Sequence, residues 1–132
     1  MASIRKEIEI GVAPDEAWDA LRDFGNLHTR LARGFAVDVR MDGSDRIVTF
    51  ASGAVLRERL VDRDDDARRL AWSIVDGPYT HHNGSAQVLA DDGRVRFVWI
   101  SDLLPHELGP ATDEAMTAGI SAIKATLEGG GG

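Results

Sequence analysis

The sequence predicts an α+β fold in which a curved antiparallel sheet of about seven strands wraps around one long C-terminal helix. Apolar and polar residues alternate with a period of two through most of the chain, whereas a helical period appears only near its two ends. The strand-like segments follow one another as hairpins. The final helix is therefore the main partner available for the buried face of the sheet.

Length and composition indicate one globular domain. The chain has 132 residues, of which 43% are hydrophobic and 28% charged, as is typical of soluble proteins. We expect a single domain over residues 1–128 and a flexible glycine tail over residues 129–132. No apolar run reaches the length of a membrane helix, and the N-terminus does not read as a secretory signal. These observations predict a cytoplasmic protein without a membrane span.

Several function classes are excluded by what the sequence lacks. The absence of cysteine removes disulfides, thiol nucleophiles and zinc–thiolate sites. A net charge of −7 without a basic cluster argues against nucleic acid as a partner. No phosphate loop, dinucleotide fingerprint, nucleophile elbow or zinc motif is present, so we expect no cofactor and no metal. Whether the chain is a monomer or a homodimer stays open.

The N-terminal part predicts a strand followed by two short helices. Alternation from Ile8 onward indicates a strand over residues 4–12. The first helix begins at Pro14, because proline is tolerated in a first turn and the acidic residues after it complement the positive helix end. Its apolar stripe is Ala17, Trp18, Leu21 and Phe24. Gly25 and Asn26 end it, and a second helical piece covers residues 27–32.

The rest of the chain predicts six strands and the long helix. The strands cover residues 35–39, 46–50, 55–61, 69–75, 81–90 and 94–103, with a charged turn over residues 62–66. The helix extends from Glu107 to Glu128, with Met116, Gly119, Ile120, Ile123 and Leu127 on one face. A curved sheet that holds one helix leaves a space between them where a small molecule would bind.

Four segments, in order, carry a family resemblance. They are Val12 to Trp18 followed by Asp23 and Phe24, residues 53–61 around Glu58, residues 69–75, and Val98 to Pro105 before the long helix. This ordered set resembles the polyketide cyclase/dehydrase and lipid-transport group of the START-like, helix-grip superfamily, also called SRPBCC. The resemblance implies a helix-grip fold with a ligand cavity. It does not specify an activity, since the superfamily includes aromatase/cyclases, lipid carriers and hormone receptors.

Glu58 is the first candidate catalytic residue. By alternation it shares a strand face with Leu56 and Leu60, while Arg57 and Arg59 point the other way. No basic residue is evident on its own face, so burial is expected to raise the pKa of the carboxyl and to suit a general acid or base. The alternative is a glutamate that bonds a neighbouring strand or a water network in the cavity.

His82 and Asp102 are the other catalytic candidates. His81 and His82 point to opposite faces, and the small and apolar residues at positions 84, 86 and 88 favour His82 as the inward one, although such a face could also be the outer one. Strict alternation places Asp102 outside, but a bulge before Pro105 could turn it inward. The alternatives are a solvated or structural histidine and a carboxylate that anchors the loop.

The candidate ligand-binding residues are mostly aromatic or helical. Alternation turns Phe97 and Trp99 inward together with Trp72, and Tyr79 lies in a loop that could rim the cavity entrance. The long helix contributes Met116, Gly119 and Ile120, with the missing side chain of Gly119 expected to leave room. The alternative for this set is ordinary hydrophobic core.

The resulting hypothesis is a cofactor-independent polyketide-type cyclase or dehydratase of secondary metabolism that acts on a small hydrophobic molecule. Shape-directed folding of the substrate would be assisted by acid–base chemistry from Glu58 and His82. The alternatives are a non-catalytic carrier or sensor of an apolar ligand, and a protein-interaction module with an exposed apolar patch. The number of polar groups that converge in the cavity discriminates enzyme from carrier.

Overall fold

The computed structural model describes residues 2–129 and has the α+β architecture expected from the sequence. The strands are β1 (Ala2–Ile10), β2 (Ala36–Asp42), β3 (Asp45–Phe50), β4 (Val55–Asp64), β5 (Arg69–Ile74), β6 (His81–Asp91) and β7 (Arg94–Leu104). The helices are α1 (Pro14–Arg22) and α2 (Gly109–Glu128), with short helical turns η1 (Phe24–Asn26), η2 (Leu27–Leu31) and η3 (His106–Leu108). The predicted long helix and the two helical pieces after the first strand are confirmed.

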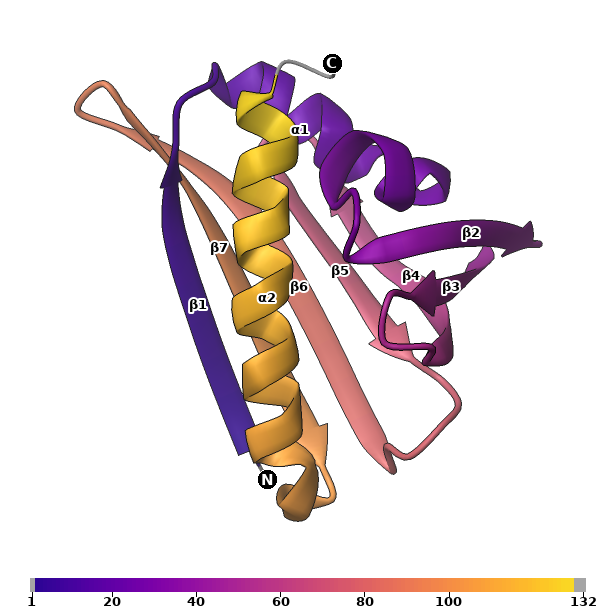
Figure 1. Ribbon diagram of the computed structural model, residues 1–132. Helices are drawn as coiled ribbons and strands as arrows, with labels where there is room; N and C mark the ends of the chain where they lie inside the picture. The colour runs from indigo at the N-terminus through magenta and orange to yellow at the C-terminus, as the bar shows by residue number, and fades with distance from the viewer. Residues whose placement is uncertain (1, 130–132) are drawn as a thin grey trace.

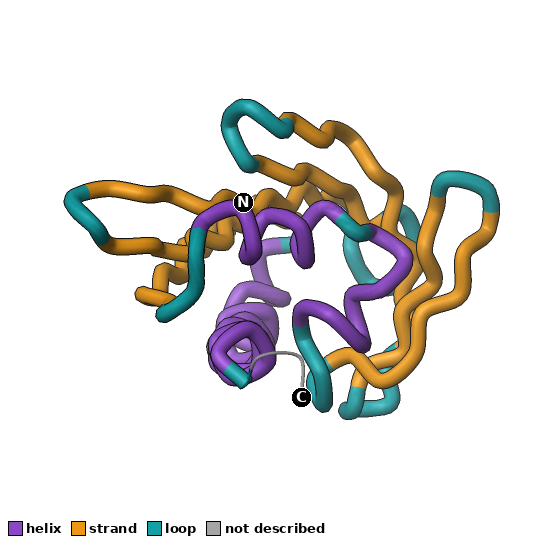
Figure 2. Tube along the Cα trace, turned by 90° about the horizontal axis from the view of Figure 1, so that it is seen from above, coloured by secondary structure: helices purple, strands orange, loops and turns teal. Residues whose placement is uncertain are grey.

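The strands within residues 2–129 form one seven-stranded antiparallel sheet in the order β1-β7-β6-β5-β4-β3-β2. Chain neighbours pair as hairpins, and β1 closes the other edge by pairing with β7. The sheet curves, and α2 lies across its concave face with α1 over one end (Figure 1). A view along α2 shows the strands curving around the helix (Figure 2). This arrangement confirms the helix-grip fold.

The first helix is shorter than the sequence pattern suggests. Pro14 starts α1, and Asp15 and Glu16 lie in its first turn, as expected. The helix ends at Arg22, because Asp23 leaves the helical backbone conformation (φ −81°, ψ 81°). Phe24 therefore opens the separate turn η1, although it is buried like the rest of the stripe. The second helical piece is a single π-helical turn, η2.

The charged turn predicted over residues 62–66 is partly strand. β4 continues to Asp64, since Asp62 pairs with Ala71 and Asp64 with Arg69 across the hairpin. The register shifts by one residue between Leu60 and Asp62, as at a β-bulge. The charged side chains are exposed at the hairpin end, where backbone pairing does not require apolar residues.

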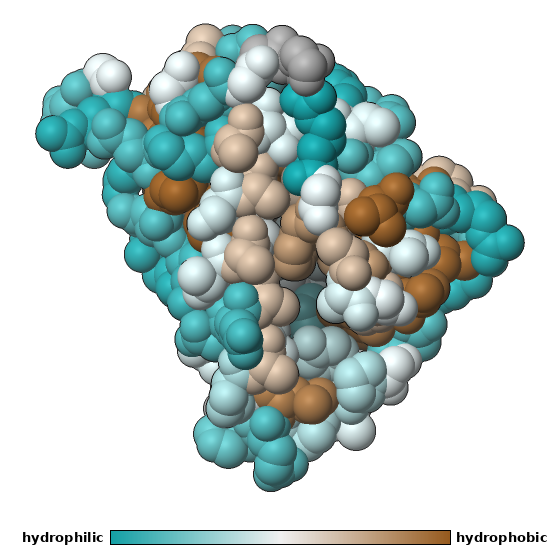
Figure 3. Space-filling view, in the orientation of Figure 1, coloured by the Kyte–Doolittle hydropathy of each residue, from teal (hydrophilic) through white to brown (hydrophobic). Residues whose placement is uncertain are grey.

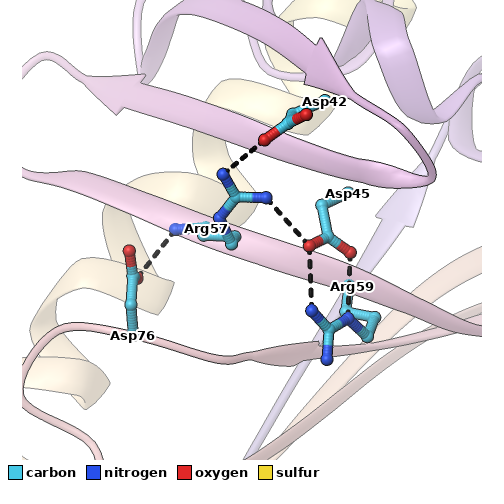
Figure 4. Close-up of polar contacts among 5 residues, drawn as sticks. All are labelled: Asp42, Asp45, Arg57, Arg59 and Asp76. Carbon is cyan, nitrogen blue, oxygen red and sulfur yellow. Dashed lines mark hydrogen bonds and ion pairs between the residues drawn. The ribbon is translucent and has the colours of Figure 1, made fainter.

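A polar network on the convex face confirms the predicted orientation of β4 (Figure 4). Arg59 donates to both carboxylate oxygens of Asp45 at 3.0 Å, while Arg57 donates to Asp45 at 3.0 Å and to Asp42 at 2.7 Å. The hydrogen bonds from Arg59 and Arg57 lower the pKa of Asp45 to about 2. Because both arginines occupy the outer face, Glu58 between them faces the concave side.

The helix α2 ends at Glu128. The Gly129 N–H donates to the Ala125 carbonyl at 3.0 Å and so closes the C-terminus of the helix. The rest of the predicted glycine tail lies outside the described residues.

Among residues 2–129, no helix combines the length and apolar character that spanning a membrane requires.

Candidate functional site

A cavity of about 800 Å³ lies between α2 and the concave face of the sheet. The space-filling view shows it as a hollow beside α2 (Figure 3). Most of its wall is apolar, and the large contributors include Phe35, Phe50, Leu56, Trp72, Trp99 and Met116. The polar residues in the wall include Arg46, Glu58, Tyr79, His82, Ser101 and Thr112. A cavity of this size accommodates a multi-ring small molecule.

A buried ion pair forms part of the cavity wall. Arg46 on β3 lies directly opposite Glu58 on β4, and both side chains are about 95% buried. The Arg46 Nε donates to Glu58 Oε1 at 2.8 Å, Nη2 lies 2.8 Å from the same oxygen, and Nη1 donates to the Phe24 carbonyl at 3.1 Å. No residue within positions 2–129 donates to Glu58 Oε2. One carboxylate oxygen is thus held and the other is free for a ligand.

This pair corrects the premise on which Glu58 was predicted to be unpaired. Arg46 alternates with Val48 and Phe50, and all three face the concave side. Its guanidinium also lies 3.9 Å from the centroid of the Phe24 ring. Burial lowers the pKa of Arg46 from its usual range, while the charge and hydrogen bonds of Glu58 oppose that effect. Glu58 therefore has a fixed cationic partner.

His82 is the histidine that faces the cavity, whereas His81 is exposed. The backbone N–H of Ile74 donates to His82 Nδ1 at 3.1 Å. An Nδ1 that accepts a hydrogen bond leaves the ring proton on Nε2. Burial first, and then the charge of His81, lower the pKa of His82 to about 4 against the opposing charge of Asp102. At neutral pH His82 is a neutral ring whose Nε2–H is a donor.

Two tryptophans form the aromatic part of the wall. The rings of Trp72 and Trp99 lie 6.5 Å apart between centroids, tilted by 47°. The indole Nε1 of Trp99 is buried and has no hydrogen-bond partner within the described residues. A buried donor without an acceptor is costly to the folded state.

Tyr79 and Thr112 close one end of the cavity. Tyr79 follows β5, and its hydroxyl is 2.8 Å from the hydroxyl of Thr112 on α2. The Tyr79 ring also lies 5.2 Å from the His82 ring, centroid to centroid. The loop before β6 is thereby linked both to α2 and to the candidate histidine.

Six of the predicted site residues line the cavity and four do not. Glu58, Trp72, Tyr79, His82, Trp99 and Met116 are in the wall. Phe97 and Ile120 belong to the packed core. The expected free space at Gly119 is already filled: a Cβ there would lie 2.7 Å from Trp99 Cζ3 and 3.0 Å from Phe35 Cε2. The glycine lets α2 approach the tryptophan and does not enlarge the cavity.

Asp102 is the fourth residue outside the cavity. The bulge that would turn it inward is absent, because β6 and β7 keep one register from His81↔Leu104 to Asp91↔Arg94. Asp102 therefore follows strict alternation to the outer face, where it accepts a hydrogen bond from the Ser3 hydroxyl on β1. Asp102 thus bonds to strand β1, and no bond to the loop before α2 is seen among the described residues.

Arg46 is the main wall residue that the sequence analysis missed. The available signal was its alternation with Val48 and Phe50, which makes it a charged residue on an apolar strand face. Recognising its partner requires the register that sets Arg46 opposite Glu58, and hairpin patterning alone did not supply that register. Ser101 and Thr112 were also missed, since small hydroxyl residues give no pattern of their own.

Known proteins were then compared with this chain. A model of the family "Polyketide cyclase / dehydrase and lipid transport" matches residues 1–129. The chain belongs to this family. The match confirms the resemblance stated from the four segments, and it agrees with a helix-grip domain built around a ligand cavity. No curated protein matches the sequence closely enough to be compared with it.

Solved structures show that the fold of this chain recurs in other proteins. XoxI from Bacillus cereus has a TM-score of 0.84 and 20% identity over 96% of each chain. A protein from Thermobifida fusca has a TM-score of 0.72 and 26% identity over 97% of this chain and 91% of that one. The di-domain ARO/CYC BexL, from the BE-7585A biosynthetic pathway, has a TM-score of 0.79 and 15% identity over 97% of this chain and 47% of BexL.

Proposed function

We propose that this protein binds a small hydrophobic metabolite in the cavity and acts on it as a polyketide-type cyclase/dehydratase without a cofactor. The observation that carries the proposal is the Arg46–Glu58 pair in a largely apolar wall, with one carboxylate oxygen free. Removing two charges from water is expensive, and binding an apolar cargo does not require it. Such a group in a cavity is therefore a candidate for chemistry.

The chemistry that fits these groups is an intramolecular aldol cyclisation followed by loss of water. The free oxygen of Glu58 would take a proton from a carbon beside a carbonyl group, and the resulting enolate carbon would bond to a second carbonyl carbon. The proton then passes to the oxygen of that carbonyl, which leaves as water with a neighbouring ring hydrogen. Donors such as His82 Nε2–H would polarise the carbonyl oxygens.

A carrier or sensor is the second candidate, and one observation favours it. His82 is held neutral, with Nδ1 occupied by the Ile74 N–H, so it can donate a hydrogen bond but does not exchange a proton readily at neutral pH. Glu58 would then be the principal acid–base group, whereas the sequence predicted that Glu58 and His82 would both take part in acid–base chemistry. A carrier needs only one or two polar anchors, and the cavity supplies them.

The remaining expectations belong to the same proposal. We propose a single-domain cytoplasmic protein of secondary metabolism, a monomer or homodimer, with a small hydrophobic molecule and no nucleic acid as its partner. The acidic charge of −7 supports the last point.

A triketone whose side-chain methyl ketone can close onto a ring ketone tests the activity. Cyclisation and dehydration give a conjugated enone, which is followed by its ultraviolet absorbance. We expect Glu58→Gln to lower the rate by about 10²- to 10⁴-fold, because a positioned base contributes that much. Asp102→Asn is the matched control, since this carboxylate lies on the outer face, and its rate should match the unmodified protein.

Binding is measured in parallel with an environment-sensitive apolar dye. If the dye binds but Glu58→Gln turns the triketone over as fast as the unmodified protein, the catalytic role of Glu58 is wrong. If the dye binds and the protein does not accelerate enone formation, the carrier function is favoured. If neither is seen, the cavity does not serve a hydrophobic ligand.

A further inference from the structure

Ser73 lies outside the cavity but contacts the backbone of its histidine. On β5 it stands between Trp72 and Ile74, both of which line the cavity, and it pairs with the exposed Arg59 on the outer side. Its hydroxyl donates to the backbone carbonyl of His82 at 2.6 Å. A residue on the convex face is thus bonded to the strand that presents His82 on the concave face.

The hydrogen-bond ladder between β5 and β6 changes at this point. The Val88 N–H donates to the Arg68 carbonyl at 2.9 Å, so these two opposed residues form a hydrogen-bonded pair. In an antiparallel ladder such pairs recur at every second position along each strand. Trp72 and Gly84 are the last hydrogen-bonded pair of this series, because regular pairing ends there. If the ladder continued by one more pair, the Ile74 N–H would donate to the His82 carbonyl. It donates to His82 Nδ1 instead, while the carbonyl accepts the Ser73 hydroxyl.

This exchange of acceptors determines which ring nitrogen of His82 carries the proton. With Nδ1 accepting from the backbone, the ring carries its proton on Nε2. No residue within positions 2–129 accepts from that Nε2–H. Trp99 Nε1–H also has no acceptor among the described residues, but this atom is buried and does not reach the cavity surface. The His82 Nε2–H is therefore a donor that the wall offers to a ligand, and what it lacks is an acceptor.

The charges of the wall favour a neutral acceptor over an anionic one. Among the described lining residues, the guanidinium of Arg46 is already paired with Glu58, and Glu114 adds a negative charge. A carboxylate ligand would find no unpaired cation there. A ketone oxygen can accept from the His82 Nε2–H without adding charge to a low-dielectric site.

We propose that Ser73 is a positioning residue that keeps His82 in its Nε2–H form, and that the cavity consequently takes its ligand by a neutral carbonyl oxygen. Ser73 acts by occupying the His82 carbonyl, so that the Ile74 N–H is left for Nδ1. This deepens the proposed function and rests on it, because it presupposes a small hydrophobic ligand in the cavity.

The tautomer is tested first by long-range proton–nitrogen NMR of the histidine rings at pH 7.5, with His82→Gln to assign the signal. We expect the Nε2–H form in the unmodified protein. In Ser73→Ala the Ile74 N–H returns to the carbonyl, Nδ1 loses its donor and an Nδ1–H population appears. Ser73→Thr keeps a hydroxyl and should restore the Nε2–H form. Ser85→Ala on β6 is the control, since the Ser85 hydroxyl has no partner within residues 2–129.

The ligand class is tested with fluorenone and fluorene, which share one ring skeleton and differ in the carbonyl oxygen. Quenching of tryptophan emission gives both affinities. We expect the unmodified protein to bind the ketone about 3- to 10-fold more tightly than the hydrocarbon, the range that one net hydrogen bond supplies. Ser73→Ala should reduce this preference towards onefold without weakening fluorene binding, and Ser73→Thr should keep it.

The outcomes separate this inference from the function on which it rests. If neither probe binds the unmodified protein, the proposed ligand-binding function fails. If both bind equally well, that function stands and the carbonyl preference is wrong. An Nδ1–H tautomer in the unmodified protein overturns the role of Ser73 even if the alanine variant does not fold. A Ser73→Ala protein with an unchanged tautomer and an unchanged preference overturns it as well.

Discussion

Two polar groups of the cavity wall, Glu58 and His82, are each held by a group on a neighbouring strand. Glu58 has Arg46 on β3, and His82 has the backbone of Ile74 on β5. Such support fixes the direction in which a side chain offers its donor or acceptor, at a cost in stability when a charge is removed from water. The groups left free for a ligand are Glu58 Oε2 and His82 Nε2–H.

The low pKa of His82 makes stability depend on pH. The folded protein keeps His82 neutral down to about pH 4, whereas in the unfolded chain the imidazole has its ordinary pKa of 6.5. The unfolded state therefore binds more protons between pH 6.5 and 4, and stability falls as pH falls through that window. Denaturant unfolding should show a loss of about 3 kcal/mol between pH 7 and pH 4 from this residue.

His82→Gln provides the comparison, because it removes the titration and keeps a polar side chain. We expect its stability to decline less steeply between pH 6.5 and 4. The carboxylates with lowered pKa, such as Asp45, lose their contribution below about pH 4 in both proteins. Parallel stability curves for the two proteins between pH 7 and pH 4 would contradict the assignment.

At the scale of the elements, two glycines make room for the two tryptophans of the wall. A Cβ at Gly84 on β6 would lie 2.8 Å from Trp72 Cε2, and one at Gly119 on α2 would lie 2.7 Å from Trp99 Cζ3. Contacts this short do not occur between unstrained side chains, so each ring lies flush against glycine backbone. The close approach of α2 to β7 therefore depends on Gly119.

Gly119→Ala should destabilise the protein by about 1–3 kcal/mol, because the added methyl group overpacks the contact with Trp99. The sign of this stability change is informative, since alanine stabilises an ordinary helix position by roughly 1 kcal/mol relative to glycine. Thermal unfolding and tryptophan emission report the two effects. Ser121→Ala, on the exposed side of α2, is the control. A stabilised Gly119→Ala protein with unchanged emission would show that the ring is not seated there.

At the scale of the whole molecule, the cavity follows from an unequal fit between the helix and the sheet. The helix α2 packs against β1 at one edge, while β3 and β4 curve away at the other and leave the space open. The mouth is bordered on α2 by small residues, among them Ala111, Ala115 and Ala118, which are exposed. The molecule thus keeps a large apolar wall accessible without exposing a large apolar side chain on the described part of this helix.

Ala115→Trp should block the cavity while leaving the fold intact, because position 115 is both exposed and part of the lining. We expect the affinity for an apolar dye to fall by at least about tenfold, as a bulky ring occupies the volume that the dye needs. Dye titration and thermal unfolding are measured together. Ser121→Trp, on the other face of α2, should bind normally. Equal dye binding by both variants would place the dye elsewhere.

The sequence by itself determined the elements and the face of most side chains, because the periods of 2 and 3.6 are local properties of the chain. Alternation correctly turned Glu58, Trp72 and Trp99 inward, and it favoured His82 over His81 without deciding between them. Alternation also placed Asp102 on the outer face unless a bulge turned it inward. The family resemblance and the helix-grip fold followed from the same local patterns in order, and both are confirmed.

Only the tertiary structure decided which of those inward side chains meet. The register that sets Arg46 opposite Glu58, the exchange of acceptors among Ser73, Ile74 and His82, and the seating of Trp99 on Gly119 each join distant or separately paired segments. A pattern along one strand shows which way a side chain points but not which partner another strand supplies. Electrostatics and packing act between such partners, so the chemistry of the cavity emerged only when the sheet was assembled.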